Sequence, residues 1–132
     1  YLFDTNIFLE ILLGQKEADP CQKALSVLTG SRPGWVTAFS LHAIEAIMGS
    51  VARLDLLAKF LAALSSHPYL FCYSTTVDEE LEICRLAPTV ELDFDDALQF
   101  YVARKKSLTL VTLDQDFKTI REISVVPPYE IG

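Results

Sequence analysis

The sequence has few basic residues, few cysteines and no long uninterrupted apolar run. Eleven Lys and Arg stand against 18 Asp and Glu, for a net charge of −7, which argues against a broad electrostatic grip on nucleic-acid phosphates. Three cysteines without a CxxC pair argue against a disulfide framework or a zinc site and fit reduced core thiols. Charges such as Glu45 and Lys59 interrupt the apolar stretches before the roughly 18 residues of a membrane span. We therefore expect a cytoplasmic protein with no membrane segment.

Glycine and proline are also scarce, at five and six of 132 residues, while 51% of the residues are apolar. This composition excludes a low-complexity or disordered chain. A chain of this length can bury roughly two-thirds of its unfolded surface. We expect one domain over residues 1–132 with a substantial core.

Short apolar, β-rich runs alternate with segments whose apolar residues have helical spacing. The runs predict strands at 1–3, 35–37, 69–73, 109–112 and 124–126, and the segments predict helices at about 7–13, 24–28, 39–49, 54–64, 76–86 and 94–106. The fifth helix is expected to stop before Pro88. This alternation predicts an α/β fold with a mostly parallel sheet buried on both faces.

Two acids directly follow predicted strands. Asp4 comes after the first strand, and Asp114 comes after the strand that ends near Leu113. In open α/β sheets, sites gather beyond the carboxyl ends of the strands, so both side chains could line one crevice. Each could equally cap a helix, because Asp is common at that position. Both interpretations stay open from these residues alone.

Glu45 is the single charge in the helical segment AIEAIM. If that segment is buried, an unpaired carboxylate there costs several kcal/mol. A lysine, an arginine or a metal ion should then face it.

The richest stretch is ELDFDDALQFYVARKK. Asp93 and Asp96 stand three apart at a predicted helix start and so share one side of the helix. Asp95 is stabilised there by the helix dipole. A capping box of Asp93 and Asp96 is a structural alternative, but it accounts for two of the three acids.

Acids from four separated places therefore predict a shared crevice, formed by Asp4, Glu45, Asp96 and Asp114. Clustered carboxylates repel one another, and hard divalent cations relieve that repulsion. Ligands that are all oxygen favour Mg²⁺ or Mn²⁺ over zinc. Two such ions would offset four of the excess negative charges and weaken the objection to a polyanionic substrate. A metal pair of this kind can hydrolyse phosphodiesters.

Two stretches resemble the PIN-domain nuclease family. FDTNIFLEIL resembles the family's opening, in which the first strand ends in Asp-Thr-Asn, and LDFDDALQFYVARKKSLTLVTLDQDF is similar to its second half. The resemblance implies a three-layer α/β/α sandwich around a five-stranded parallel sheet of order 3-2-1-4-5. It also implies a ribonuclease that uses one or two Mg²⁺ or Mn²⁺ ions.

Carried over residue by residue, the resemblance makes Asp4, Glu45 and Asp96 the central ligands and Asp114 the fourth acid. Asn6 would orient the first acid or a water on the metal, Thr112 would support the site by hydrogen bonding, and Asp93 would be an accessory candidate. Four bases remain candidates for phosphate contacts: Arg32, Arg53, Lys118 and Arg121.

The working hypothesis is an endoribonuclease acting on RNA. Small single-domain members of the family are mostly VapC-type toxins of type II toxin–antitoxin pairs, which implies a homodimer and a cognate antitoxin. The alternative is a PIN-like module that binds RNA or a protein without cutting, against which the four-acid set argues. A haloacid dehalogenase-like site would need Asp-x-Asp after the first strand, where the sequence has Asp4-Thr5-Asn6.

Overall fold

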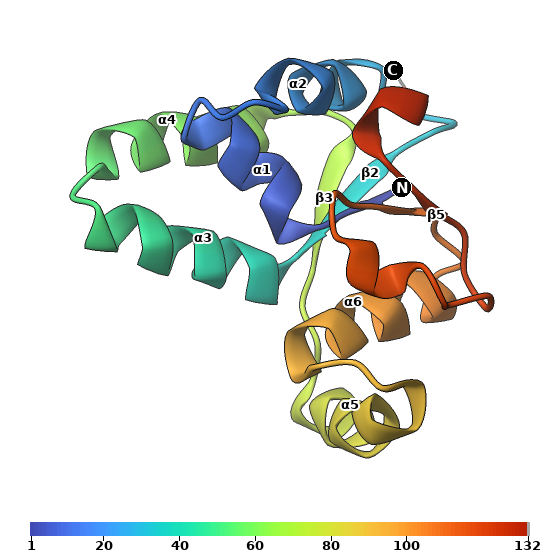
Figure 1. Ribbon diagram of the computed structural model, residues 1–132. Helices are drawn as coiled ribbons and strands as arrows, with labels where there is room; N and C mark the ends of the chain where they lie inside the picture. The colour runs from blue at the N-terminus through green and yellow to red at the C-terminus, as the bar shows by residue number, and fades with distance from the viewer. Residues whose placement is uncertain (132) are drawn as a thin grey trace.

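Five parallel strands form one sheet in the computed structural model, which describes residues 1–131 (Figure 1). The strands are β1 (Leu2–Phe3), β2 (Gly34–Thr37), β3 (Leu70–Tyr73), β4 (Leu110–Val111) and β5 (Val125–Val126), in the order β3-β2-β1-β4-β5. In the central strand β1, Leu2 is in register with Trp35 of β2 and with Leu110 of β4. The predicted order 3-2-1-4-5 is confirmed.

Helices cover both faces of the sheet. Those on one side are α1 (Thr5–Leu12), α2 (Ala18–Ser26), α3 (Ala38–Ser50) and α4 (Leu54–Ser66), and those on the other are α5 (Val77–Val90) and α6 (Phe94–Lys105) (Figure 1). Two short 3₁₀ turns follow, η1 (Gln115–Phe117) and η2 (Pro128–Glu130). The result is the predicted three-layer α/β/α sandwich.

Strand side chains divide between two cores because successive residues of a strand point to opposite faces. Phe3 and Val111 pack in the core under α1–α4, whereas Leu2 and Leu110 pack in the core against α5 and α6. All four side chains have no exposed surface. Central strands buried on both faces read as continuous apolar runs, which is why β1 and β4 were recognisable in the sequence.

Helix α5 differs from its prediction, because it continues through Pro88 to Val90. Pro88 lies near the end of the helix, where its missing N–H removes one backbone hydrogen bond. Buried Ile83 and Ala87 anchor that part of the helix in the core. The chain leaves the helix at Glu91, whose φ of 56° lies in the left-handed region.

The prediction of core thiols is correct for one cysteine only. All three are free, and Cys21 is buried, whereas Cys72 and Cys84 are exposed. Cys72 lies on β3, an edge strand of the sheet. Within residues 1–131, no helix is both long enough and apolar enough to span a membrane.

Candidate metal centre

Three carboxylates from distant parts of the chain meet at the carboxyl ends of β1 and β4. Asp4 follows β1, Asp114 follows β4, and Asp96 lies in the first turn of α6. One carboxylate oxygen of each residue lies within 4.8 Å of those of the other two. Since β1 and β4 are parallel neighbours, their ends bring Asp4 and Asp114 together.

Asp4 has both of the roles considered for it. Its Oδ1 accepts a hydrogen bond of 2.8 Å from the Thr5 backbone N–H and caps α1. Its Oδ2 accepts one of 2.7 Å from Thr112 Oγ1. The side chain is 6% exposed. Because one oxygen caps the helix while the residue also belongs to the acidic group, the two roles do not exclude each other.

Asn6 and Thr112 join the two strand ends. Asn6 Nδ2 donates to Thr112 Oγ1 at 3.2 Å and to Asp4 Oδ2 at 3.4 Å, while its Oδ1 accepts from the Leu113 N–H at 3.3 Å. Thr112 Oγ1 also accepts from the Asp114 N–H at 2.9 Å. These contacts are of the kind that the sequence led us to expect for both residues. Their part in catalysis stays a prediction.

Burial and mutual repulsion disfavour the ionised forms of these acids. Burial raises the pKa of Asp4, an effect that hydrogen bonds from Thr112 and Thr5 partly offset. The pKa of Asp96 is raised to about 7, first by burial and then by the neighbouring charges of Asp95 and Asp114. In residues 1–131, the salt bridges join other acids to Arg53, Arg104 and Lys105. Among the described residues, no basic side chain forms a salt bridge with the three carboxylates.

The three carboxylates open into a pocket of about 290 Å³. Its other polar lining residues are Thr5, Asn6, Asp95 and Gln99, and its apolar ones are Leu9, Phe39, Ala43 and Ile47. Asp95, which was assigned only to the helix dipole, is exposed and adds a fourth carboxylate to the lining.

Glu45 is not among the acids that the structure brings together. The residues of α3 that line the pocket are Phe39, Ala43 and Ile47, each one turn after the last. Two positions along a helix correspond to about 200° around its axis, so Glu45 points away from the side that Ala43 presents. Glu45 is also partly exposed. The premise of a buried carboxylate is therefore wrong, and solvent removes the need for a cation.

Asp93 occupies the N-cap position of α6, but its side chain makes no capping hydrogen bond. It is exposed, and it lines a different hollow together with Asp96 and Asp116. The capping box suggested for Asp93 and Asp96 is therefore absent. Asp93 also lies outside the group of three carboxylates.

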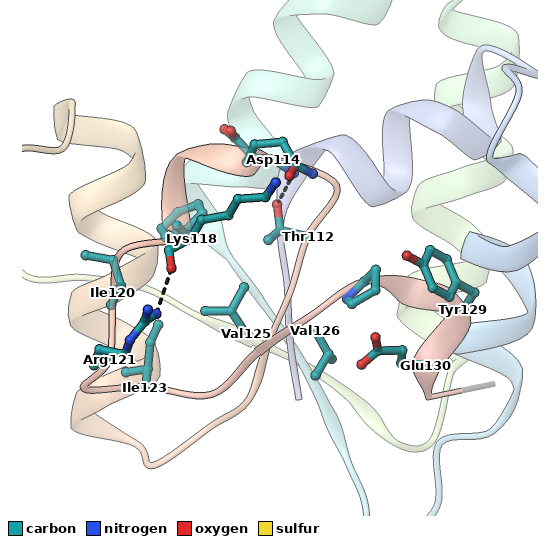
Figure 2. Close-up of a pocket in the computed structure, with 13 residues that line it drawn as sticks. Thr112, Asp114, Lys118, Ile120, Arg121, Ile123, Val125, Val126, Tyr129 and Glu130 are labelled. Carbon is teal, nitrogen blue, oxygen red and sulfur yellow. Dashed lines mark hydrogen bonds between the residues drawn. The ribbon is translucent and has the colours of Figure 1, made fainter.

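A larger pocket of about 650 Å³ adjoins the acidic group and shares Asp114 with it (Figure 2). Lys118 and Arg121 lie on one side of this pocket, and Tyr129 and Glu130 lie on the other. Val125 and Val126 of β5 lie between the two sides in Figure 2.

The four basic candidates lie in different surroundings. The Arg121 guanidinium donates to the Lys118 carbonyl oxygen at 2.8 Å, and Thr112 and Asp114 line the same pocket. Arg53 pairs instead with Asp55 at 3.0 Å, and Arg32 lies over the Tyr1 ring. Of the four, Lys118 and Arg121 line the pocket that shares Asp114 with the carboxylate group.

The sequence motifs did not identify Gln99 as a site residue. Its side chain is 2% exposed and lines the acidic pocket. The available signal was an amide side chain between Leu98 and Phe100 in an apolar stretch. A buried amide needs partners, so this residue could have been singled out.

Comparisons with known proteins agree with this geometry. The PIN domain family model matches residues 1–123, and the chain belongs to the PIN domain family. A toxin–antitoxin complex from Klebsiella pneumoniae is similar, with 22% identity, 97% of both chains covered and a TM-score of 0.74. VapBC2 from Rickettsia felis, bound to a DNA fragment from its promoter, has 17% identity over 96% of this chain and 97% of the other, with a TM-score of 0.77.

VapC20 from Mycobacterium tuberculosis, described as a toxin that cleaves the sarcin–ricin loop, shares 17% identity over 93% of this chain and 98% of its own, with a TM-score of 0.74. A comparison with curated protein sequences finds no match. At these identities, the solved structures establish the fold and no more.

Proposed function

We propose that the chain is an endoribonuclease that depends on Mg²⁺ or Mn²⁺ and hydrolyses RNA phosphodiester bonds. The observation that carries this proposal is the convergence of Asp4, Asp96 and Asp114, from three separate elements, within 4.8 Å of one another in a PIN domain. The proposed ligands are these three acids. Glu45 is left out of the set because α3 presents Ala43 and Ile47 to the pocket.

The residues fit a hard divalent cation. The donors are carboxylate oxygens, which Mg²⁺ and Mn²⁺ prefer. Without a cation, burial and repulsion raise the pKa of Asp4 and of Asp96, so a positive ion is what the group lacks. When bound, such an ion polarises the scissile phosphate and acidifies a water molecule.

The chain's own side chains would position the reaction. The hydrogen bonds from Thr112 and Thr5 fix the Asp4 carboxylate, and Asn6 links it to the strand end that carries Asp114. The third acid, Asp96, lies on α6, which covers the face of the sheet opposite to α1. Preorganised polar groups of this kind save reorganisation during the reaction.

Lys118 and Arg121 would receive RNA phosphates on the side of Asp114. They line the larger pocket, in which neither is joined to an acid by a salt bridge within residues 1–131. In a chain of net charge −7, such a local basic wall supports binding of a polyanion more directly than the overall charge does.

The toxin assignment is part of the same proposal. The similar structures include a toxin–antitoxin complex and VapBC2, which supports a cytoplasmic toxin of a type II pair. We propose a cognate antitoxin as protein partner and a homodimer as the active form. Co-expression with the neighbouring reading frame, followed by size-exclusion chromatography with light scattering, tests both.

The function is tested by incubating the purified chain with RNA in Mg²⁺, in Mn²⁺ and in EDTA. Cleavage should require the cation and should fall at least 100-fold in Asp96→Asn, because a ligand is lost. Glu45→Gln is the matched control, since it removes a carboxylate outside the group, and it should cut as the parent does. Cation-independent cleavage, or cleavage by Asp96→Asn at the parent's rate, would refute the proposal.

A binding module without nuclease activity is the second candidate. The apolar contribution of α3 to the pocket favours it, because the complete four-acid set no longer argues for catalysis. It predicts RNA or protein binding without any cation-dependent cleavage. Calorimetric titration with Mn²⁺ separates the two, since the module should release no heat that depends on Asp4.

A further inference from the structure

Gln99 holds a buried polar atom that has no hydrogen-bond partner among the described residues. The residue lies on α6 one turn after Asp96, so the two side chains share one side of the helix. Its Nε2 donates to Ser40 Oγ at 2.6 Å. Its Oε1 is the buried side-chain nitrogen or oxygen that lacks a hydrogen-bond partner within residues 1–131. Such orphaned atoms are rare in native proteins and call for an explanation.

The amide is fixed in place from α3. Ser40 has no exposed surface, and its Oγ also contacts the hydroxyls of Thr5 and Thr37, at 2.8 Å and 3.1 Å. Thr37 in turn caps α3 through the Ser40 backbone N–H. Because one end of the Gln99 amide is held by this hydroxyl cluster, the whole side chain, which lines the acidic pocket, has a fixed orientation.

The residues of α3 that line the pocket offer no oxygen ligand from their side chains. Ala43 and Ile47 are apolar, and Glu45 lies on another side of the helix. Asp4, Asp96 and Asp114 therefore contribute three oxygens, and a hard cation takes six or more, with water completing its shell. In proteins, the side-chain carbonyl oxygen of Gln can coordinate hard cations.

We propose that Gln99 Oε1 is the neutral fourth ligand of the divalent cation, standing where a fourth carboxylate was expected. The inference rests on the proposed function, because it concerns the same cation. It explains why the orphaned oxygen is kept: the oxygen is unpartnered in the cation-free protein and satisfied in the loaded one. Compared with a carboxylate, a neutral amide ligand also leaves less negative charge at the site to repel an approaching RNA phosphate.

The test is calorimetric Mn²⁺ titration of the cation-free chain of 132 residues, with thermal unfolding measured in EDTA. Gln99→Met keeps the length of the side chain and removes the oxygen. We expect its Mn²⁺ affinity to fall on the order of 10-fold. Its unfolding midpoint in EDTA should change little, because removal of the orphaned oxygen offsets the loss of the Nε2–Ser40 hydrogen bond. Gln22→Met, at an exposed position of α2, is the control and should bind as the parent does.

Gln99→Glu provides an independent arm. It keeps an oxygen on the pocket side and adds a charge, so Mn²⁺ should bind more tightly than to the parent. If Gln99→Glu binds no more tightly than the parent, the side chain does not reach the cation and the inference is wrong. The Gln99→Glu variant therefore tests whether Gln99 binds the cation even if Gln99→Met does not fold.

The inference can fail separately from the proposed function. If the parent binds Mn²⁺ through Asp96 and Gln99→Met binds it equally well, Gln99 is structural and only the inference is lost. A purely structural role also predicts a lower unfolding midpoint in Gln99→Met at constant affinity. If the parent itself binds no Mn²⁺, the proposed function and the inference are both wrong.

Discussion

Thr112 donates a hydrogen bond of 2.7 Å from its hydroxyl to Asp4, a residue 108 positions away in the sequence. The same oxygen accepts from the Asp114 N–H and from Asn6 Nδ2. One hydroxyl therefore sets the spacing of two of the three clustered carboxylates. Its position at the end of β4, directly beside β1, makes this possible.

Replacing Thr112 with Val should damage both stability and the site. The side chain is 4% exposed, so the change leaves a buried carboxylate oxygen, an amide and a backbone N–H with fewer partners. We expect a loss of about 1–3 kcal/mol in the free energy of unfolding, together with weaker Mn²⁺ binding. Urea denaturation and calorimetry measure the two effects. Thr119→Val, at an exposed position, should change neither, and a Thr112→Val variant as stable as the parent would contradict the assigned role.

The cation-free protein should become less stable as pH rises from about 4 to about 7. In the fold, the pKa of Asp96 is raised from 3.8 to about 7, chiefly by burial, so over this range the folded state holds a proton that the unfolded state has released. Stability then falls with increasing pH. Solvent screening of the partly exposed side chain leaves an effect on the order of 2 kcal/mol.

Thermal unfolding in EDTA across this pH range tests that expectation. Asp96→Asn, which cannot ionise, should be more stable than the parent above pH 7 and should lose most of the slope. Asp93→Asn replaces an exposed acid on the same helix start and should keep the slope. An identical slope in the parent and in Asp96→Asn would rule out Asp96 as its source.

Removing the bases of the larger pocket should weaken RNA binding without changing the fold. Lys118→Ala and Arg121→Ala each delete a cation from a wall next to Asp114. For single-stranded RNA, each lost phosphate contact should reduce the slope of log affinity against log salt by about 0.7. Fluorescence anisotropy with the non-cleaving Asp96→Asn background gives that slope. Lys59→Ala, on an exposed part of α4, is the control, and equal slopes in all variants would exclude this wall as an RNA contact.

Two glycines should respond in opposite directions to alanine. A Cβ on Gly34 would lie 2.6 Å from Leu28 Cδ1 and 2.8 Å from Phe3 Cε2, inside the core. Gly34→Ala should therefore cost about 1–3 kcal/mol of stability. A Cβ on Gly49, within α3, meets nothing within 4 Å, so Gly49→Ala should be neutral or stabilise by about 0.5 kcal/mol. Chemical denaturation of both variants checks the contrast, and a Gly34→Ala protein as stable as the parent would contradict the close packing of β2.

The layered fold could be predicted because its signals are local. The apolar runs at Leu2–Phe3 and Leu110–Val111 mark strands buried on both faces, and the helical patterns between the runs predict helical crossovers, which join parallel strands. The error at Pro88 has a physical origin. A proline inside a helix costs about 3 kcal/mol, and the packing of Ile83 and Ala87 in the core offsets that cost.

Three of the four expected acids are brought together because strand ends and a helix start define their positions. Asp4 and Asp114 follow neighbouring parallel strands, and Asp96 begins the helix that packs beside them. The position of Glu45 depended instead on the rotation of α3 about its own axis, which the local sequence does not determine.

The sequence by itself therefore determined the α/β class, the order of the elements and, to within about two residues, the ends of the strands, because hydrophobic periodicity and turn chemistry act over a few residues. The tertiary structure alone decided which side of each helix faces the pocket. It turned Glu45 away, set Ala43 and Ile47 against the carboxylates and placed Gln99 beside them with one oxygen unpartnered. The physical reason is that the rotation of a helix is set by how its apolar side packs on the sheet, here through Ile44 and Met48, and that packing depends on contacts between residues far apart in the chain.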